Sequence, residues 1–166
     1  MRVKVHPAAI VEALLAALGA FGGLAVIVLL GENWLSPRGF GLVVGALASS
    51  SVLVFGACES PFAQPRNVVL SYILCPIVGT IVALLVPVTW VAAGLAVAAA
   101  VLVMRVTHSM HPPGGALALL PVLGDPGLHA LGYRFIVVPM VGAVLLLSIS
   151  LLWSQATHTR YPVRWF

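Results

Sequence analysis

Apolar and polar residues form long alternating blocks along this chain rather than short periods. Five apolar blocks lie between short polar stretches. Each is long enough to cross a bilayer as a helix, which needs about 20 apolar residues. Only helices satisfy their own backbone hydrogen bonds in lipid without closing a barrel, so the pattern predicts an all-α, polytopic transmembrane protein. The expected spans cover residues 8–30, 39–57, 68–86, 88–107 and 135–153.

Composition supports the same class. Hydrophobic residues make up 61% of the 166 residues and charged residues 7%, whereas soluble proteins average about half and a quarter. The length suits a single transmembrane domain, 1–166. The net charge of +4 includes no Lys/Arg cluster, which argues against a nucleic-acid partner. Cys58 and Cys75 stand in or beside apolar spans, where packing is expected rather than a disulfide.

Two polar breaks interrupt the middle of the chain. The first break is Ser-Pro-Phe-Ala-Gln-Pro-Arg-Asn at 60–67, and the second is His-Ser-Met-His-Pro-Pro-Gly-Gly at 108–115. A proline pair suits the first turn of a helix, where backbone donors have no partner anyway. We therefore expect the chain to break at His111 and a short re-entrant-type helix to run from about Pro113 to Leu120.

These motifs resemble a known family. His-Pro-Pro followed by small residues, the upstream break at 60–67 and the ending Arg-Tyr-Pro-Val-Arg-Trp at 160–165 are similar to the HPP family of integral membrane proteins. The resemblance covers nearly the whole chain. It implies a transporter, because family members are known or proposed as transporters and plastid and cyanobacterial relatives are linked to nitrite.

The sequence also suggests an internal repeat. Residues 45–60 align with 94–109, matching Val-Leu-Val and a final Ser, and 72–79 align with 135–142, matching Ile, Pro, Val and Gly. We expect a first span and loop at 1–38, a repeat unit at 39–88, a second at 89–154 and a tail at 155–166. The two units would point the same way about an axis along the membrane normal. Pro76 and Pro139 would kink their helices at the same place.

The repeat superposes the two breaks, so two helix amino termini are expected to converge there. Unpaired amides and the positive ends of two helix dipoles form a natural anion site. His108 and His111 can add charge near neutral pH. The predicted substrate or pore-lining residues are Ser60, Gln64, Arg66, Asn67, Arg105, His108, Ser109, His111, Gly114 and Gly115; the predicted structural residues are Glu59, Pro65, Pro76, Pro112, Pro113 and Pro139.

Each of these side chains also has a plain structural interpretation. Arg66 can extend to lipid headgroups, and Arg105 can pair with Glu59. Gln64 and Asn67 can cap helix ends. The i,i+3 histidines lack a third ligand nearby in sequence, so no metal or other cofactor is expected. No Gly-x-Ser-x-Gly motif or catalytic triad is apparent, which argues against an enzyme.

The functional prediction is therefore transport of a small inorganic anion, with nitrite as the expected example, by a channel or a carrier. The alternatives are a non-transporting binding module in the membrane and a transporter of another solute or a cation. The lipid bilayer is the first partner. A homo-oligomer is expected, because five spans are few for a wide polar path. The basic residues weakly favour a cytoplasmic amino terminus, with Arg160 and Arg164 outside, and a bacterial inner membrane is the expected location.

Overall fold

The computed structural model describes the backbone of residues 7–31, 37–124 and 135–165, and the side chains of these residues except 31 and 37–42. Within this part the chain is helical and contains no strand. Its helices are α1 (Pro7–Gly31), α2 (Pro37–Gly56), the 3-10 helix η1 (Pro61–Ala63), α3 (Pro65–Leu85), α4 (Thr89–Val106), α5 (Pro113–Leu123) and α7 (Val137–Thr157). The all-α prediction is confirmed, and each expected span corresponds to one of these helices.

Among the residues that the structure describes, four helices are long and apolar enough to cross a membrane: Pro7–Leu30, Pro65–Leu85, Thr89–Val106 and Val137–Thr157. The second expected span corresponds to α2, whose part with described side chains, Val43–Gly56, is a shorter apolar helix. The predicted short helix after the second break is α5. The sequence also predicts an interfacial loop around Trp34, a turn at 125–127, an interfacial His129 and an Arg134 on the cytoplasmic side, and these residues lie outside the described part of the chain.

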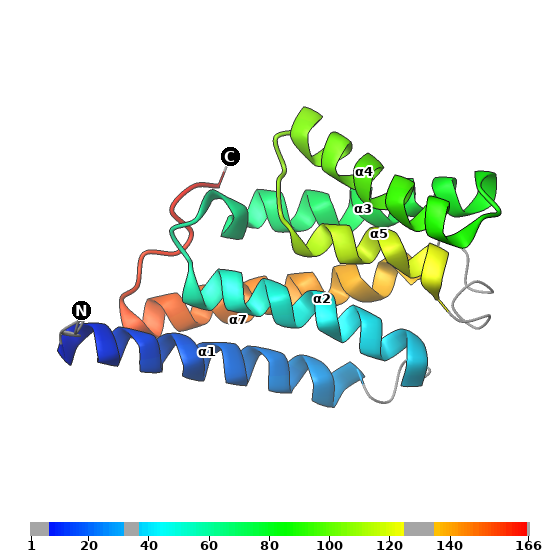
Figure 1. The fold of residues 1–166 in the computed structure, drawn as a ribbon. Coiled ribbons are helices and arrows are strands. Elements are labelled where there is room, and N and C mark those ends of the chain that lie inside the picture. Colours follow the sequence, from blue (N-terminus) through cyan, green and yellow to red (C-terminus); the bar gives the residue numbers. More distant parts are fainter. Residues whose placement is uncertain (1–6, 32–36, 125–134, 166) are drawn as a thin grey trace, which may run out of the picture.

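Successive helices run in opposite directions (Figure 1). Gly114 of α5 lies against Ser71 and Cys75 of α3, and Ala118 lies against Gly79, so α5 is parallel to α3. Gly19 of α1 meets Trp153 and Gly23 meets Leu146, so α7 is antiparallel to α1. The helices α1, α3 and α5 therefore point one way, and α2, α4 and α7 point the other.

This alternation corrects the predicted position of the tail. Five spans would have placed the two chain ends on opposite sides of the membrane, with Arg160 and Arg164 away from the breaks. In Figure 1 the start of α1 and the tail after α7 lie at the same end of the bundle, near the two breaks. The reason is that α5 starts at the end of the bundle where α4 finishes and runs away from it. The helix α7 therefore starts at the opposite end and returns.

The second half of the predicted repeat is also wrong. The block 45–60 on 94–109 pairs α2 with α4, which do run in the same direction. The block 72–79 on 135–142 pairs α3 with α7, which run in opposite directions, so one rotation cannot relate both blocks. Apolar helices draw on few residue types, and matches in register arise easily. Since α5 runs parallel to α3, and follows the second break as α3 follows the first, α5 rather than α7 is the counterpart of α3.

The two prolines of that alignment differ in role as well. Pro76 lies inside α3, and the Thr80 hydroxyl donates to its carbonyl at 2.8 Å. Pro139 lies in the first turn of α7, where no helical hydrogen bond is lost. The expected shared kink is therefore wrong for Pro139.

Close packing between α3 and α5 holds the second break in place. A Cβ on Gly79 would collide with the backbone carbonyl of Ala118, so glycine is required for this approach. Gly19 and Gly23 of α1 are covered by the Phe55 ring of α2, which is packing within one subunit. The larger apolar core joins α2, α3, α5 and α7, and a smaller one joins α3, α4 and α5.

Candidate functional site

The two polar breaks meet, as expected. The Arg66 guanidinium donates to the carbonyls of His108 at 2.7 Å and Thr107 at 2.9 Å. The Asn67 amide donates to the carbonyls of Pro61 at 2.7 Å and Met110 at 3.3 Å. The two Arg66 bonds join the start of α3 to the end of α4, and they satisfy carbonyls that a helix end leaves without a partner.

Local sequence explains the shape of each break. Ser60 caps η1 by accepting the Phe62 amide at 3.2 Å, and Pro65 occupies the first turn of α3. In the second break His108 adopts a positive φ of 51°, which reverses the chain after α4. The buried Ser109 hydroxyl lies 2.6 Å from that of Thr107, and Pro113 opens α5.

A cluster of buried polar groups lies beneath the breaks. His111, Ser50 of α2 and Tyr72 of α3 each have 0% exposure. The Ser50 hydroxyl lies 2.7 Å from the Tyr72 hydroxyl and 2.8 Å from Nε2 of His111. Nδ1 of His111 lies 2.7 Å from the Phe62 carbonyl of η1. We call these groups the His111 cluster; it joins α2, η1, α3 and the second break.

Sequence analysis did not identify Ser50 and Tyr72. A signal was present, because Ser49, Ser50 and Ser51 follow one another inside an apolar span and Tyr72 stands inside another. Polar side chains within spans are uncommon and usually face a partner. Their spacing alone does not show that these two meet His111.

The expectation that His111 carries charge near neutral pH is wrong. Burial lowers its pKa from the ordinary 6.5 to about 4, although the hydrogen bond to the Phe62 carbonyl acts in the opposite direction. A carbonyl can only accept, so Nδ1 carries a proton. His111 is therefore neutral at pH 7, protonated on Nδ1, and Nε2 accepts.

A second cluster fastens the tail to the first break. Nε2 of the Gln64 amide donates to the carbonyls of Cys58 at 2.9 Å and Ser60 at 2.8 Å, and Oε1 accepts the amides of Val163 and Arg164 at 3.0 Å each. The Tyr161 hydroxyl donates to the Ala63 carbonyl at 2.8 Å. Burial raises the pKa of this phenol, which stays protonated. We call this set of bonds the tail clasp; the sequence predicted Gln64 as an anion contact or a helix cap, not as a partner of the tail.

Other predicted anion contacts are already occupied. The amides of Gly114 and Gly115 donate to the carbonyls of His111 at 2.9 Å and Pro112 at 3.0 Å, because Pro112 already has helical φ and ψ. The expected unpaired amides of α5 are thus not free. Gly114 is buried among Ser71, Cys75 and Met104, a packing position. Arg105, His108 and Glu59 are exposed.

Charges gather at the end of the bundle that holds the breaks and the tail. The charged side chains that the structure describes are Arg66, Arg105, Arg160, Arg164, Glu12 and Glu59, and all belong to this end. Among these six no ion pair forms, so the expected pairing of Arg105 with Glu59 is not seen. The described parts of the bundle beyond this end carry no charged side chain.

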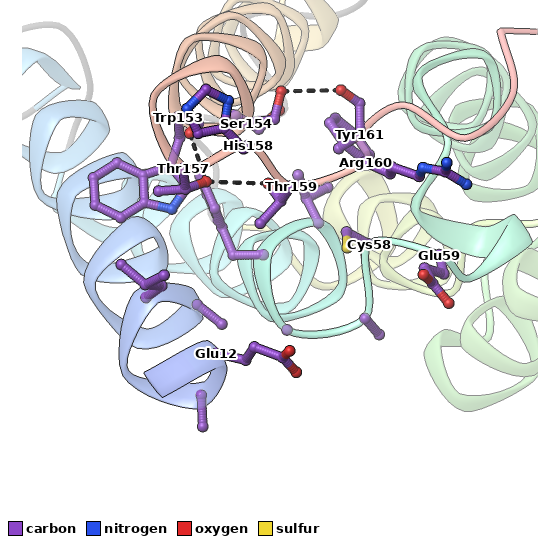
Figure 2. Close-up of a pocket in the computed structure, with 18 of the residues that line it drawn as sticks. Glu12, Cys58, Glu59, Trp153, Ser154, Thr157, His158, Thr159, Arg160 and Tyr161 are labelled. Carbon is purple, nitrogen blue, oxygen red and sulfur yellow. Dashed lines mark hydrogen bonds between the residues drawn. The ribbon is translucent and has the colours of Figure 1, made fainter. Parts of the chain in front are cut away.

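A cavity of about 770 Å³ opens at the same end, between α1, α2, α7 and the tail. Figure 2 shows Glu12 on the α1 side and Glu59 and Arg160 on the opposite side. Cys58, Trp153 and Tyr161 also line it. We call this space the tail cavity. The sequence predicted neither its position nor Glu12 and Arg160 as its lining. The described residues contain no group of three His, Cys, Asp or Glu that could hold a metal.

Comparison with known proteins agrees with a transmembrane protein. Residues 5–162 match the family described as "HPP, transmembrane region". The chain belongs to the HPP family of transmembrane proteins. Two transmembrane proteins of Dictyostelium discoideum are 34% and 37% identical to it over 155 residues, which is 90% of this chain. No solved structure matches the chain.

The chain spans about half the length of these curated relatives, 54% and 50% respectively. Their descriptions state a transmembrane location without a substrate. Integral membrane location is thus established for this HPP chain. Its expected bacterial membrane stays a prediction, because these relatives come from Dictyostelium.

Proposed function

We propose that this HPP protein transports a small monovalent inorganic anion, entering or leaving at the end that carries the breaks and the tail. The observation that supports this proposal most is the charge at this end, which has four arginines and two glutamates among the described side chains. Arg66 is held by carbonyls, so Arg105, Arg160 and Arg164 supply the free positive charge. Clustered positive charge raises the local concentration of anions.

The same charge supports an orientation. Basic residues accumulate on the cytoplasmic side of membrane proteins, so the breaks, the tail and both chain ends are assigned to the cytoplasm. Nitrite is the proposed substrate on the strength of the family resemblance. Channel and carrier both remain compatible with this proposal, which includes no chemical conversion. A homo-oligomer is part of it, since α1 is largely exposed along its length.

One observation favours the rival function, a membrane module that binds a partner without transport. The donors of Arg66, Asn67 and Gln64 are directed to backbone carbonyls, as in a structural junction. In that case the breaks would shape the fold, and the exposed basic residues would meet headgroups or another protein.

Reconstitution of the full chain into vesicles separates the two functions. Gradients of nitrite, nitrate, chloride and potassium are applied in turn, with protein-free vesicles as the blank. Anion flux that falls several-fold in Arg105→Gln and persists in Gln155→Ala, an exposed residue without charge on α7, supports transport. No flux of any anion would overturn the proposal and favour the binding module.

A further inference from the structure

The His111 cluster contains more hydrogen-bonding capacity than one arrangement of protons uses. The Ser50 hydroxyl has one proton, yet two acceptors lie within reach: Nε2 of His111 at 2.8 Å and the Ala46 carbonyl at 3.0 Å. The Tyr72 hydroxyl lies 2.7 Å from the same oxygen and can donate to it. The Ser50 proton therefore has two available positions.

In the first arrangement His111 is neutral. Nδ1–H donates to the Phe62 carbonyl, the Ser50 hydroxyl donates to Nε2, and the Tyr72 hydroxyl donates to the Ser50 oxygen. Each ring nitrogen and each hydroxyl has a partner. In the described residues no buried side-chain nitrogen or oxygen is left unsatisfied.

In the second arrangement His111 carries an additional proton. A proton from the aqueous phase forms an N–H bond with the Nε2 lone pair, and that group donates to the Ser50 oxygen. The Ser50 O–H bond rotates to the Ala46 carbonyl, and the bonds from Tyr72 and Nδ1 remain. No covalent bond breaks, no heavy atom has to move, and all donors again have acceptors.

We infer that the His111 cluster is a proton-binding site, built so that His111 gains and loses one proton while every polar group stays hydrogen-bonded. A buried histidine whose Nε2 accepts from a donor that cannot turn away lacks this property, because that donor faces the new proton directly and one partner is lost. Here Ser50 acts as the exchangeable partner, and the Ala46 carbonyl of the same helix is its second acceptor.

The surroundings determine how the site responds. The groups that face His111 are Ser50 from α2, the Phe62 carbonyl from η1, Tyr72 from α3 and the Met104 sulfur from α4, which lies 3.5 Å from its backbone nitrogen. Tyr72 is titratable but neutral as a donor. No charged side chain among the described residues contacts the ring. An anion that approached this site would therefore favour the protonated ring.

The link between protonation of His111 and movement of an anion rests on the proposed function. A monovalent anion that moves alone transfers charge across the membrane potential, whereas an anion that moves with one proton transfers none. Arg66 and Asn67 donate to the carbonyls of His108 and Met110, which precede His111 in the second break. The site thus assigns to the HPP protein the class of proton-coupled anion transport.

The proton site is tested first, without any substrate. The full chain is labelled with ¹⁵N-histidine and studied by NMR in lipid nanodiscs. The His111 signal is the one that disappears in His111→Gln. Wild type should show the Nδ1-protonated neutral ring at pH 7 and one titration below the ordinary histidine range. Ser50→Ala should lower the proton affinity about tenfold or more, because the protonated ring loses a charge-assisted bond.

Two further variants keep this test decisive. Ser50→Thr retains the hydroxyl and should retain the titration even if Ser50→Ala does not fold. Ser49→Ala removes the neighbouring hydroxyl, which bonds the Gly45 carbonyl, and should leave the titration unchanged. A ring protonated on Nε2 at pH 7, or the same titration in Ser50→Ala as in wild type, overturns the proton site.

Coupling is tested separately in vesicles with a nitrate gradient, because undissociated nitrous acid would itself cross lipid. Internal pH should change with nitrate flux in wild type, and the change per nitrate should fall several-fold in Ser50→Ala but not in Ser49→Ala. Nitrate flux without any pH change overturns the coupling. Absence of all anion flux overturns the proposed function instead, while the titration still decides whether the proton site exists.

Discussion

The His111 cluster and the tail cavity lie at the same end of one bundle and differ in almost every physical respect. The His111 cluster is buried, has no charged side chain and contains a hydrogen-bond partner for each polar atom. The tail cavity is open, and its two glutamates and Arg160 are exposed. The difference shows that polar groups in an apolar bundle are tolerated in two ways, by complete pairing or by access to water.

The tail clasp lies between the two regions and connects them. The amide nitrogen of Gln64 donates to the first break, where the Phe62 carbonyl contacts His111. The amide oxygen of Gln64 accepts from the tail that lines the cavity. Substitutions in the clasp should therefore affect both regions, whereas substitutions in the cavity should affect one. The predictions below test this distinction.

Gln64→Leu should have the largest effect. It removes four side-chain hydrogen bonds, so the Cys58 carbonyl and the amides of Val163 and Arg164 lose their partner, while the Ser60 carbonyl keeps the Ala63 amide. At a net 0.5–1.5 kcal/mol for each bond, we expect a loss of roughly 2–6 kcal/mol in folding free energy. Thermal unfolding in detergent measures it. Gln155→Leu on the exposed face of α7 is the matched control, and equal stability of the two variants would contradict the role of the clasp.

Acid should destabilise the protein through His111. The unfolded side chain has a pKa near 6.5 and the folded one about 4, so the unfolded state binds more protons between these values. The stability is complete above pH 6.5 and is lost as the pH falls toward 4, by about 3 kcal/mol in total. Unfolding at several pH values should show a smaller acid loss in His111→Gln. Parallel pH profiles for the two proteins would argue against a buried neutral ring.

Tyr161→Phe should have a moderate effect. The phenol loses its bond to the Ala63 carbonyl, while the ring keeps its apolar contacts and Gln64 still holds the tail. We expect a loss of about 1 kcal/mol, together with faster proteolysis of the tail. Limited digestion of wild type and variant compares the two. An intact tail and unchanged stability would mean that Gln64 alone closes the clasp.

The cavity should show the smallest effect on stability and a clear effect on access. Cys58 lines the tail cavity and is partly exposed, whereas Cys75 is buried between α3, α4 and α5. A charged thiol reagent should modify one cysteine per chain, and Cys58→Ala should abolish the reaction with less than about 0.5 kcal/mol of lost stability. Modification of Cys75 in the folded protein would show that the smaller core opens.

The sequence by itself determined the class of the protein. Blocks of apolar residues about as long as a bilayer is thick require helices, because lipid offers the backbone no hydrogen-bonding partner. The proline pair at 112–113 similarly placed the start of α5, since proline suits a first helical turn and little else in a helix. The two breaks could be recognised as a pair, and they do meet.

The tertiary structure decided the direction of α7, the partners of Arg66 and Gln64, and the neutral state of His111. Apolar periodicity carries no information on which way a helix crosses, so α3 and α7 looked alike although they run in opposite directions. Arg66 and Gln64 bond carbonyls, and every residue type has a carbonyl, so no sequence pattern marks the acceptor. The charge of a histidine depends on burial and on its neighbours in space, and Ser50 lies 61 positions away in the sequence.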